Sequence, residues 1–330
     1  MSDNNVILSI QNLSKEFKLR GEGLFAKPQV LHALSDVSLD VYEGETLGII
    51  GESGCGKSTL GRCIVGLHTP TSGKVVFEGT DIASLKGAAR KPVSKNIQMI
   101  FQDSYSSLDP RFTAAAAIEE PMLIHGTEPD AAKRQERVLQ LMKEVGLDVQ
   151  HLQRYPHEFS GGQRQRINVA RALSLDPKII VCDEPVSALD VSIQAQVLNL
   201  FRRLQRERGL TYVFISHDLS VVKHISDRVA IMYLGRVMEI SPAHSIYENP
   251  LHPYTKALLS AIPPENPFER HPEMKLEGEI PSPVGYQVGC PLAGRCPNAT
   301  ERCHRERPAL VETEPNHKVA CFLYHDEVAE

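Results

Sequence analysis

The sequence has 330 residues, of which 42% are hydrophobic and 23% are charged. This composition is typical of globular proteins, and the length suggests about two domains. The formal net charge of −5 argues against a nucleic-acid partner, because such proteins normally carry a clustered basic excess. No apolar run reaches the roughly 18 residues of a membrane-spanning helix, and the first residues lack a signal-peptide pattern. We therefore expect a soluble chain that is not exported.

Short apolar runs alternate with longer helical patterns from Val6 to about Ile240. This alternation is typical of an α/β protein built on a mainly parallel sheet. Buried parallel strands are predicted at 46–50, 178–182 and 212–216. Antiparallel pairing is indicated at two places, by the glycine turn that ends "GKVVFEG" and by the turn-like "YLGR" within "RVAIMYLGRVMEI".

The spacing of apolar residues predicts a helix directly after Lys57 and a second helix from Ser192, as its N-cap, to a stop at Gly209. Between 104 and 176 strand signals vanish and helix-compatible sequence dominates, so we expect an inserted helical region. Beyond 240 the prolines become frequent and break any long element. The segment 241–330 is therefore expected to be a small, irregular extension, which is either a linker with a small stapled module or a loosely folded tail.

The stretch "GESGCGKST" (51–59) fits the pattern G-x-x-x-x-G-K-[ST] between a predicted strand and a predicted helix. Glycines let backbone N–H groups surround phosphates, and the helix N-terminus adds favourable partial charge. Lys57 is expected to reach the β- and γ-phosphates, and the Ser58 hydroxyl to bind Mg²⁺. The alternative, a glycine-rich turn that binds nothing, does not explain the position between strand and helix. The predicted nucleotide-binding residues here are Gly51, Glu52, Ser53, Gly54, Cys55, Gly56, Lys57, Ser58 and Thr59.

A predicted buried strand ends in two acidic residues in "KIIVCDEP" (178–185). Buried carboxylates are costly unless a cation or a reaction requires them. Asp183 is expected to hold Mg²⁺, through water, and Glu184 to polarise an attacking water. The alternative is a strand that runs into a solvated acidic turn.

Three further polar groups follow predicted strands or precede predicted helices. In "FSGGQRQR" (159–166), Ser160 and two glycines precede a helical pattern and form either a second anion site or an ordinary N-cap. His217 ends an apolar strand and is placed to donate a hydrogen bond to a γ-phosphate, although lone histidines are more often structural. Gln102 follows a strand-like run, where its amide would ligate Mg²⁺ or orient water.

Together and in this order, the motifs resemble the nucleotide-binding subunit of ATP-binding cassette (ABC) transporters, from about Val6 to Ile240. In that family 51–58 is the Walker A loop, "SGGQ" (160–163) the signature, "CDE" the end of Walker B and "SALD" (187–190) the D-loop. The resemblance implies that Lys57, Gln102, Glu184 and His217 are catalytic and that Ser58, Gln102 and Asp183 bind Mg²⁺. Around ATP, outside Walker A, it places Phe17, Gln102, Ser160, Gly161, Gly162, Gln163, Asp183, Asp190 and His217.

The family also implies a fold and an assembly. The expected fold is a P-loop α/β core of ABC type (1–103 and 177–240) with an antiparallel β subdomain. It also has an inserted helical signature subdomain (104–176) and the extension (241–330). Two such subunits pair head to tail, and each ATP lies between Walker A of one and the signature of the other. Because Glu184 and His217 are both present, the resemblance implies a site that hydrolyses ATP.

Beyond the cassette, "ENPLHPYTKALLSAIP" (248–263), "EGEIPSPVG" (277–285) and the cysteine segment after Gly289 resemble the extension of oligopeptide and dipeptide importer ATPases. This implies peptide uptake at the cytoplasmic face of a bacterial cell membrane. It also implies two permease subunits, an identical or paralogous ATPase and an extracytoplasmic solute-binding protein. The same resemblance leaves glutathione, nickel complexes or sugars as alternative solutes. A soluble ABC protein of DNA repair or the ribosome is less consistent with the single cassette and the acidic balance.

Four of the seven cysteines lie in the extension, namely Cys290, Cys296, Cys303 and Cys321. Their wide spacing does not match the usual zinc knuckle, but four thiolates suit either tetrahedral zinc or a [4Fe–4S] cluster. His304 and His317 are possible substitutes for one ligand. The family resemblance favours the iron–sulfur cluster, with zinc and free or disulfide-prone thiols as the alternatives.

Overall fold

The computed structural model describes residues 5–19, 29–261, 274, 276–285 and 288–325. They fall into two compact units. The first unit contains Tyr42–Thr46 and Ser84–Ser216, and the second contains Val6–Val41, Leu47–Ala83 and His217–Glu330. Among the described residues, no helix combines the length and the apolar composition that crossing a membrane requires.

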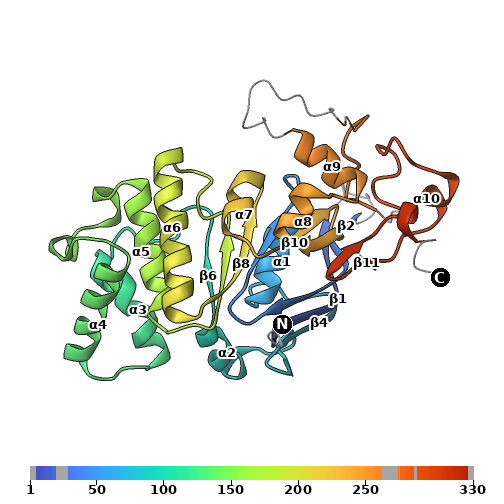
Figure 1. Ribbon diagram of the computed structural model, residues 1–330. Coiled ribbons are helices and arrows are strands. Elements are labelled where there is room, and N and C mark those ends of the chain that lie inside the picture. Colours follow the sequence, from blue (N-terminus) through green and yellow to red (C-terminus); the bar gives the residue numbers. More distant parts are fainter. Residues whose placement is uncertain (1–4, 20–28, 262–273, 275, 286–287, 326–330) are drawn as a thin grey trace, which may run out of the picture. The chain divides into compact units, whose positions relative to one another are not determined.

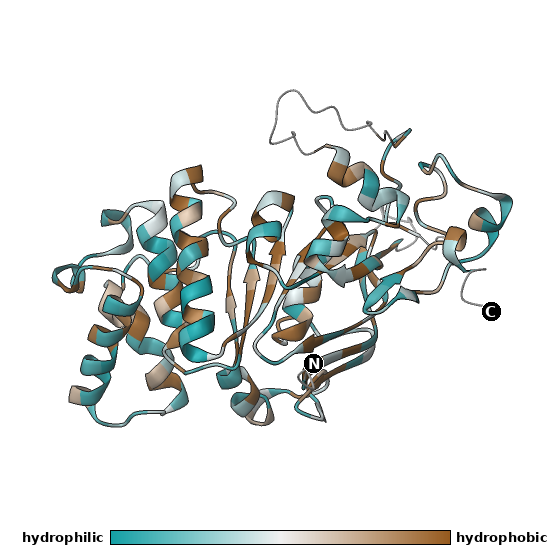
Figure 2. Ribbon diagram, in the orientation of Figure 1, coloured by the Kyte–Doolittle hydropathy of each residue, from teal (hydrophilic) through white to brown (hydrophobic). Residues whose placement is uncertain are grey.

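The first unit contains three parallel strands in the order β8-β7-β6. They are β6 (Ile97–Ile100), β7 (Ile179–Asp183) and β8 (Thr211–Ser216). Every residue of β7 and β8 is buried, as the continuous apolar runs predict, and β8 is largely hydrophobic in Figure 2. The two strands predicted here are confirmed, with shifted ends: β7 begins one residue later and extends to Asp183, and β8 begins one residue earlier, at Thr211.

The first unit also contains five α-helices among its described residues (Figure 1). They are α2 (Lys91–Asn96), α3 (Ala114–His125), α4 (Ala131–Glu144), α5 (Gly161–Leu173) and α6 (Val191–Arg208), with short 3₁₀ turns at Gly87–Ala89, Val149–His151 and Pro156–Glu158. Between 104 and 176 the chain forms helices and no strand, as predicted. The helices α3, α4 and α5 contact one another, and α5 contacts α6.

The start of α6 differs from the sequence prediction. The N-cap is Asp190, whose backbone is extended and whose carbonyl accepts the N–H groups of Ile193 (2.9 Å) and Gln194 (2.8 Å). Ser192 already lies inside the first turn. The predicted stop is correct, because Gly209 adopts the left-handed conformation (φ 64°) that favours glycine at a helix C-terminus.

Two sheets form the second unit. One has the order β2-β1-β4-β5, from β1 (Val6–Leu19), β2 (Gln29–Tyr42), β4 (Ser72–Phe77) and β5 (Thr80–Asp81). The other strands follow the order β11-β12-β10-β9-β3, from β3 (Thr46–Ile50), β9 (Arg228–Tyr233), β10 (Arg236–Pro242), β11 (Val311–Glu314) and β12 (His317–Val319). The pairs β4–β5 and β9–β10 are antiparallel, as predicted, and β3 is parallel to β9.

The second unit also contains helices, which alternate with these strands along the chain. They are α1 (Lys57–Ile64), α7 (Leu219–Ile225), α8 (Ala243–Glu248), α9 (Pro253–Ser260) and α10 (Glu301–Arg305), with a 3₁₀ turn at Phe322–Tyr324. The first of these starts directly after the glycine-rich loop, as the spacing of apolar residues predicts.

The described part of the extension contains regular elements that bond to the rest of the second unit. Its strand β12 pairs with β10, and the backbone of 283–285 bonds to β2, where His32 N–H donates to Pro283 O (3.0 Å). At the centre of the contact with β10, the fully buried carboxylate of Glu239 accepts the N–H groups of Leu251 (2.8 Å) and His252 (2.9 Å). His317 Nε2 lies 2.7 Å from the same carboxylate. A buried carboxylate needs such partners, so this cluster ties the extension to the sheet.

Candidate functional site

The glycine-rich loop connects β3 to α1 and is packed too closely for side chains at two of its glycines. A Cβ on Gly51 would lie 2.2 Å from the carbonyl oxygen of Met232, and one on Gly56 would lie 2.3 Å from that of Ala33. Gly56 is also the N-cap of α1 with φ 105°. Only glycine fits these positions, which leaves the loop backbone and the helix N-terminus accessible to an anion.

Lys57 is the first residue of α1 and is 4% exposed. Its Nζ donates to the carbonyl oxygens of Gly51 (2.6 Å) and Glu52 (3.0 Å). The first turn of α1 contains no acidic residue, so the positive charge and the helix dipole are not offset there. The loop therefore presents a cation and a helix N-terminus, which is what a polyphosphate requires.

The acidic pair lies at the end of β7 in the first unit. Asp183 is 2% exposed, and Glu184 has a φ of 48°, an uncommon backbone conformation for a residue with a side chain. The Glu184 N–H donates to Ile215 O (3.0 Å), and its Oε2 accepts a hydrogen bond from Gln102 Nε2 (2.8 Å). The structure thus brings Gln102 and Glu184 together, and strain of this kind is characteristic of functional sites.

The predicted signature begins α5. Ser160 is the N-cap, its Oγ accepts the N–H of Gln163 (3.3 Å), and Gln163 Oε1 accepts the N–H of Ser160 (2.9 Å). The helix therefore starts at Gly161, so both glycines lie in its first turn and do not precede it. A Cβ on Gly162 would lie 2.4 Å from Ile193 Cγ2 in α6. This packing places the signature next to the helix that follows Asp190.

Phe17 and His217 belong to the second unit. Phe17 is half-buried in β1, with Lys15 Nζ 4.8 Å from its ring centroid and the His68 ring at 5.4 Å, edge to face. His217 is exposed and follows β8 directly. Its neighbour Asp218 caps α7 by accepting the N–H groups of Ser220 (2.8 Å) and Val221 (3.3 Å). The strand-end position predicted for His217 is correct.

The four cysteines of the extension line one cavity of about 330 Å³, and none of them forms a disulfide. Burial raises the pKa of Cys290 and of Cys321 to about 11, and neighbouring thiols add to the shift. Across the described residues, however, no three His, Cys, Asp or Glu side chains are close enough to hold a metal ion as they stand. The donor set and the shared cavity suit a sulfur-ligated metal, whereas the present side-chain positions do not form its ligand shell.

Neither predicted substitute ligand lines this cavity. His317 is 1% exposed and is committed to Glu239, and His304 is exposed on α10. The residues that complete the cavity wall are mainly apolar, and they include Leu292 and Phe322.

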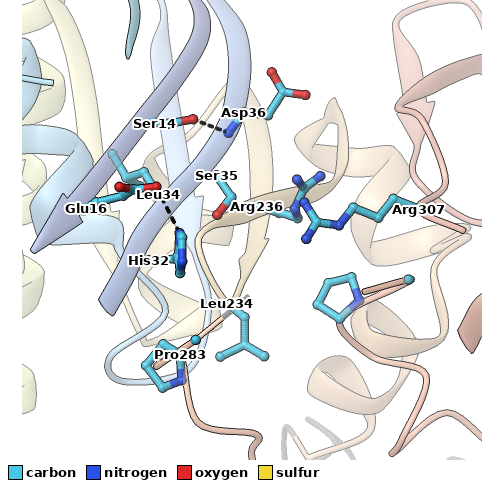
Figure 3. A pocket seen from close by; sticks show the side chains of 13 residues that line it. Ser14, Glu16, His32, Leu34, Ser35, Asp36, Leu234, Arg236, Pro283 and Arg307 are labelled. Atoms are coloured by element: carbon cyan, nitrogen blue, oxygen red, sulfur yellow. Dashed lines mark hydrogen bonds and ion pairs between the residues drawn. The ribbon is translucent and has the colours of Figure 1, made fainter. Parts of the chain in front are cut away.

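The sequence did not predict two groups of contacts. The first surrounds a cavity of about 340 Å³ between β1, β2 and the extension. Figure 3 shows Arg236 and Arg307 extending toward the same region of this cavity, and Glu16 lies 3.2 Å from His32. Second, Tyr254 and Arg295 contact Glu52 of the phosphate-binding loop. No sequence signal points to these contacts, because they join positions more than 200 residues apart.

Two family descriptions match the chain. Residues 34–187 match "ABC transporter", and residues 238–303 match "Oligopeptide/dipeptide transporter, C-terminal region". Oligopeptide transport ATP-binding protein AppF of Bacillus subtilis (strain 168) is 51% identical over 327 residues, covering 98% of this chain and 99% of that protein. Oligopeptide transport ATP-binding protein OppF of Escherichia coli (strain K12) is 49% identical, covering 96% of both.

A dipeptide relative and a solved structure agree with this result. Dipeptide transport ATP-binding protein DppF of Haemophilus influenzae (strain ATCC 51907 / DSM 11121 / KW20 / Rd) is 48% identical, covering 98% of each chain. The dimeric structure of MJ0796, described as a bacterial ABC transporter cassette, is 30% identical with a TM-score of 0.64 and covers 72% of this chain and 98% of its own.

The likeness extends over almost the whole chain, and the C-terminal region matches its own family description. The chain therefore belongs to the ABC transporter ATP-binding proteins of the oligopeptide/dipeptide type and is an ABC-type ATPase.

Proposed function

We propose that this chain binds and hydrolyses ATP to power the uptake of peptides through an ABC importer. The observation that carries the proposal is the near full-length likeness to oligopeptide and dipeptide transport ATP-binding proteins, including the C-terminal region. Other solutes, such as glutathione, nickel complexes or sugars, are the competing assignments within the same kind of subunit.

The residues that would bind the triphosphate are those of the loop 51–59. Lys57 Nζ now bonds to two loop carbonyls, and phosphate oxygens, which are charged, would compete well for the same donor. Phe17 would stack on the adenine, and His217 would donate to the γ-phosphate. These roles follow from the match between this chain and the family motifs.

Glu184 is assigned to the attacking water. Its carboxylate is held by Gln102 at 2.8 Å, and its backbone is fixed at φ 48° by the bond to Ile215. A carboxylate held in one direction is suited to orient a water and to accept its proton. Gln102 acts on this reaction through its contact with Glu184.

Ser58, Gln102 and Asp183 would hold Mg²⁺. Their hydroxyl, amide and carboxylate oxygens are the donors that this ion prefers, and Asp183 is nearly completely buried. When bound, Mg²⁺ neutralises charge on the phosphates. Asp183 supplies the only carboxylate of this set, so it would dominate the affinity for the ion.

The signature would act on the ATP of a second subunit. Ser160 is exposed at the N-terminus of a 13-residue helix, and Gly161, Gly162 and Gln163 form its first turn. Such a helix end favours an anion, and the dimeric MJ0796 cassette offers a precedent for pairing. Asp190, at the N-cap of α6, would lie at the same subunit contact, and the partner is either a second copy or a paralogue.

The remaining partners would be two permease subunits and an extracytoplasmic solute-binding protein, with the chain bound peripherally to the cytoplasmic face of the bacterial cell membrane. Affinity purification from mild-detergent extracts of the host tests this assignment. The proposal predicts stoichiometric recovery of two integral membrane proteins and an ATPase partner. Recovery of ribosomes or DNA-bound proteins instead would reject it in favour of a soluble ABC ATPase.

The four cysteines of the extension would hold a [4Fe–4S] cluster, with zinc as the alternative. Their common cavity and sulfur donors support this assignment. When bound, the cluster would link the segment 290–303 to the end of the chain. Protein purified without oxygen should contain iron and acid-labile sulfide, and Cys296→Ser should lose both. Stoichiometric zinc without iron would reject the cluster.

A further inference from the structure

Glu52, the second residue of the phosphate-binding loop, is held by the C-terminal extension within the second unit. Its backbone N–H donates to Tyr254 Oη in α9 at 3.0 Å. Its carboxylate pairs with Arg295, whose Nη1 lies 3.2 Å from Oε2 and 3.5 Å from Oε1. Its carbonyl accepts from Lys57 at 3.0 Å. The N–H, the carbonyl and the side chain of Glu52 are therefore all fixed, two of them by the extension.

The partners of Glu52 are themselves shielded from solvent. Tyr254 is fully buried, and its ring lies 4.7 Å, centroid to centroid, from that of Tyr233. Arg295 also donates to Tyr233 Oη at 3.2 Å, and its side chain is 12% exposed, against 26% for Glu52. An ion pair between partly buried groups is screened less by water and salt than a surface pair.

The negative charge of the Glu52 carboxylate would weaken binding of a polyanion by this loop. An unpaired carboxylate in this loop would repel the phosphates of ATP. Arg295 neutralises the carboxylate, and the hydroxyl of Tyr254 fixes the direction of the peptide group beside it. Both effects would act before ATP binds, so ordering of the loop would not reduce the binding free energy.

We propose that Arg295 and Tyr254 of the extension are positioning residues for the nucleotide site, and that they increase the affinity for MgATP by neutralising and orienting Glu52. The inference rests on the proposed binding of ATP by this loop. It gives the extension a role in nucleotide binding, in addition to any role of its cysteine cavity.

The test measures MgATP binding to the full-length protein by titration calorimetry. Arg295→Gln should weaken binding roughly threefold to tenfold, the range expected for a partly shielded ion pair, and the weakening should shrink at high salt. In turnover the change should appear mainly in KM. The double variant Glu52→Gln/Arg295→Gln should recover affinity relative to Arg295→Gln, because the unpaired charge is gone. Arg305→Gln is the control, since Arg305 belongs to the same extension but pairs with Glu301 in the exposed α10.

Two results would overturn the inference while leaving ATP binding intact. One is wild-type affinity in Arg295→Gln. The other is a double variant that binds no better than Arg295→Gln, which would indicate structural damage and not an unpaired charge. Tyr254→Phe, which keeps the ring but removes the acceptor, should also weaken binding. Failure of the wild-type protein to bind MgATP would contradict the proposed function itself.

Discussion

Gly162 shows how single residues in the signature are constrained by packing. A Cβ at this position would lie 2.4 Å from Ile193 Cγ2, whereas one at the neighbouring Gly161 would lie 3.2 Å from Leu189 Cδ2. Both residues are helical, so alanine would otherwise be favoured by about 1 kcal/mol over glycine. The two positions therefore differ in their surroundings more than in their backbone.

Gly162→Ala should be destabilising and Gly161→Ala close to neutral. Overpacking of this kind costs about 1–3 kcal/mol, which exceeds the gain in helix propensity, and the half-buried Ile193 side chain must shift to relieve it. Thermal unfolding of the two variants checks this expectation, with Gly161→Ala as the matched control. Equal melting temperatures for the two variants would show that Ile193 in α6 can move away from the added Cβ without loss of stability.

At this scale the sequence predicts local features well. The loop 51–59, the acidic pair Asp183–Glu184 and the cap at Ser160 are contiguous motifs whose spacing reveals them, and the structure places each at the expected end of a strand or helix. The sequence does not predict that Arg295 and Tyr254 contact Glu52, or that His317 is committed to Glu239, because these pairs depend on tertiary contacts between distant segments.

Helix α9 of the extension has a buried N-cap. His252 is the N-cap, and its Nδ1 accepts the Tyr254 N–H at 3.0 Å, which requires the neutral imidazole. Burial lowers the pKa of His252 to about 4, with a smaller contribution from Lys256, while Glu239 opposes the shift. The neutral form is thus favoured in the folded protein.

His252 should make folding stability depend on pH in a defined direction. Its folded pKa lies below the ordinary value of 6.5, so its contribution is fully present above about pH 6.5 and is lost as the pH falls toward about 4. The loss should be on the order of 3 kcal/mol. Thermal unfolding of wild type and His252→Asn across this range checks it, since asparagine also caps helices but does not titrate.

His304→Asn serves as the control for that comparison, because His304 is exposed on α10. The expected result is a flatter pH profile in His252→Asn and an unchanged one in the control. If the profile of His252→Asn parallels that of the wild type, the buried imidazole is not the group responsible.

Elements were predicted more accurately than their boundaries. The continuous apolar runs at β3, β7 and β8 and the turn between β9 and β10 were recognisable because each is a local pattern. The sequence does not distinguish Asp190 from Ser192 as the N-cap of α6, because both are good cap residues and only the backbone conformation decides between them. The sequence does not reveal strands β11 and β12, because both are short and β12 acquires its partner β10 through tertiary contact, while β11 pairs with β12.

For the whole molecule, the order of motifs along the chain predicted the family, and the comparisons confirm it. The division into units was not predictable in the same way. Tyr42–Thr46 belongs with Ser84–Ser216, although the intervening residues belong to the other unit. One reason is that Tyr212 N–H bonds to Glu45 O (2.9 Å) and Gly44 N–H to Thr211 Oγ1 (2.9 Å), contacts that no local pattern reveals.

The central claim, that this chain is an ATPase whose water-activating group is Glu184, is tested most directly by ATP turnover in two variants. Glu184→Gln keeps the shape of the side chain and should bind ATP but hydrolyse it barely at all, because the amide is a poor proton acceptor. Lys57→Ala should instead bind ATP weakly, since the phosphates lose their cation. Near-normal turnover in Glu184→Gln would contradict the account.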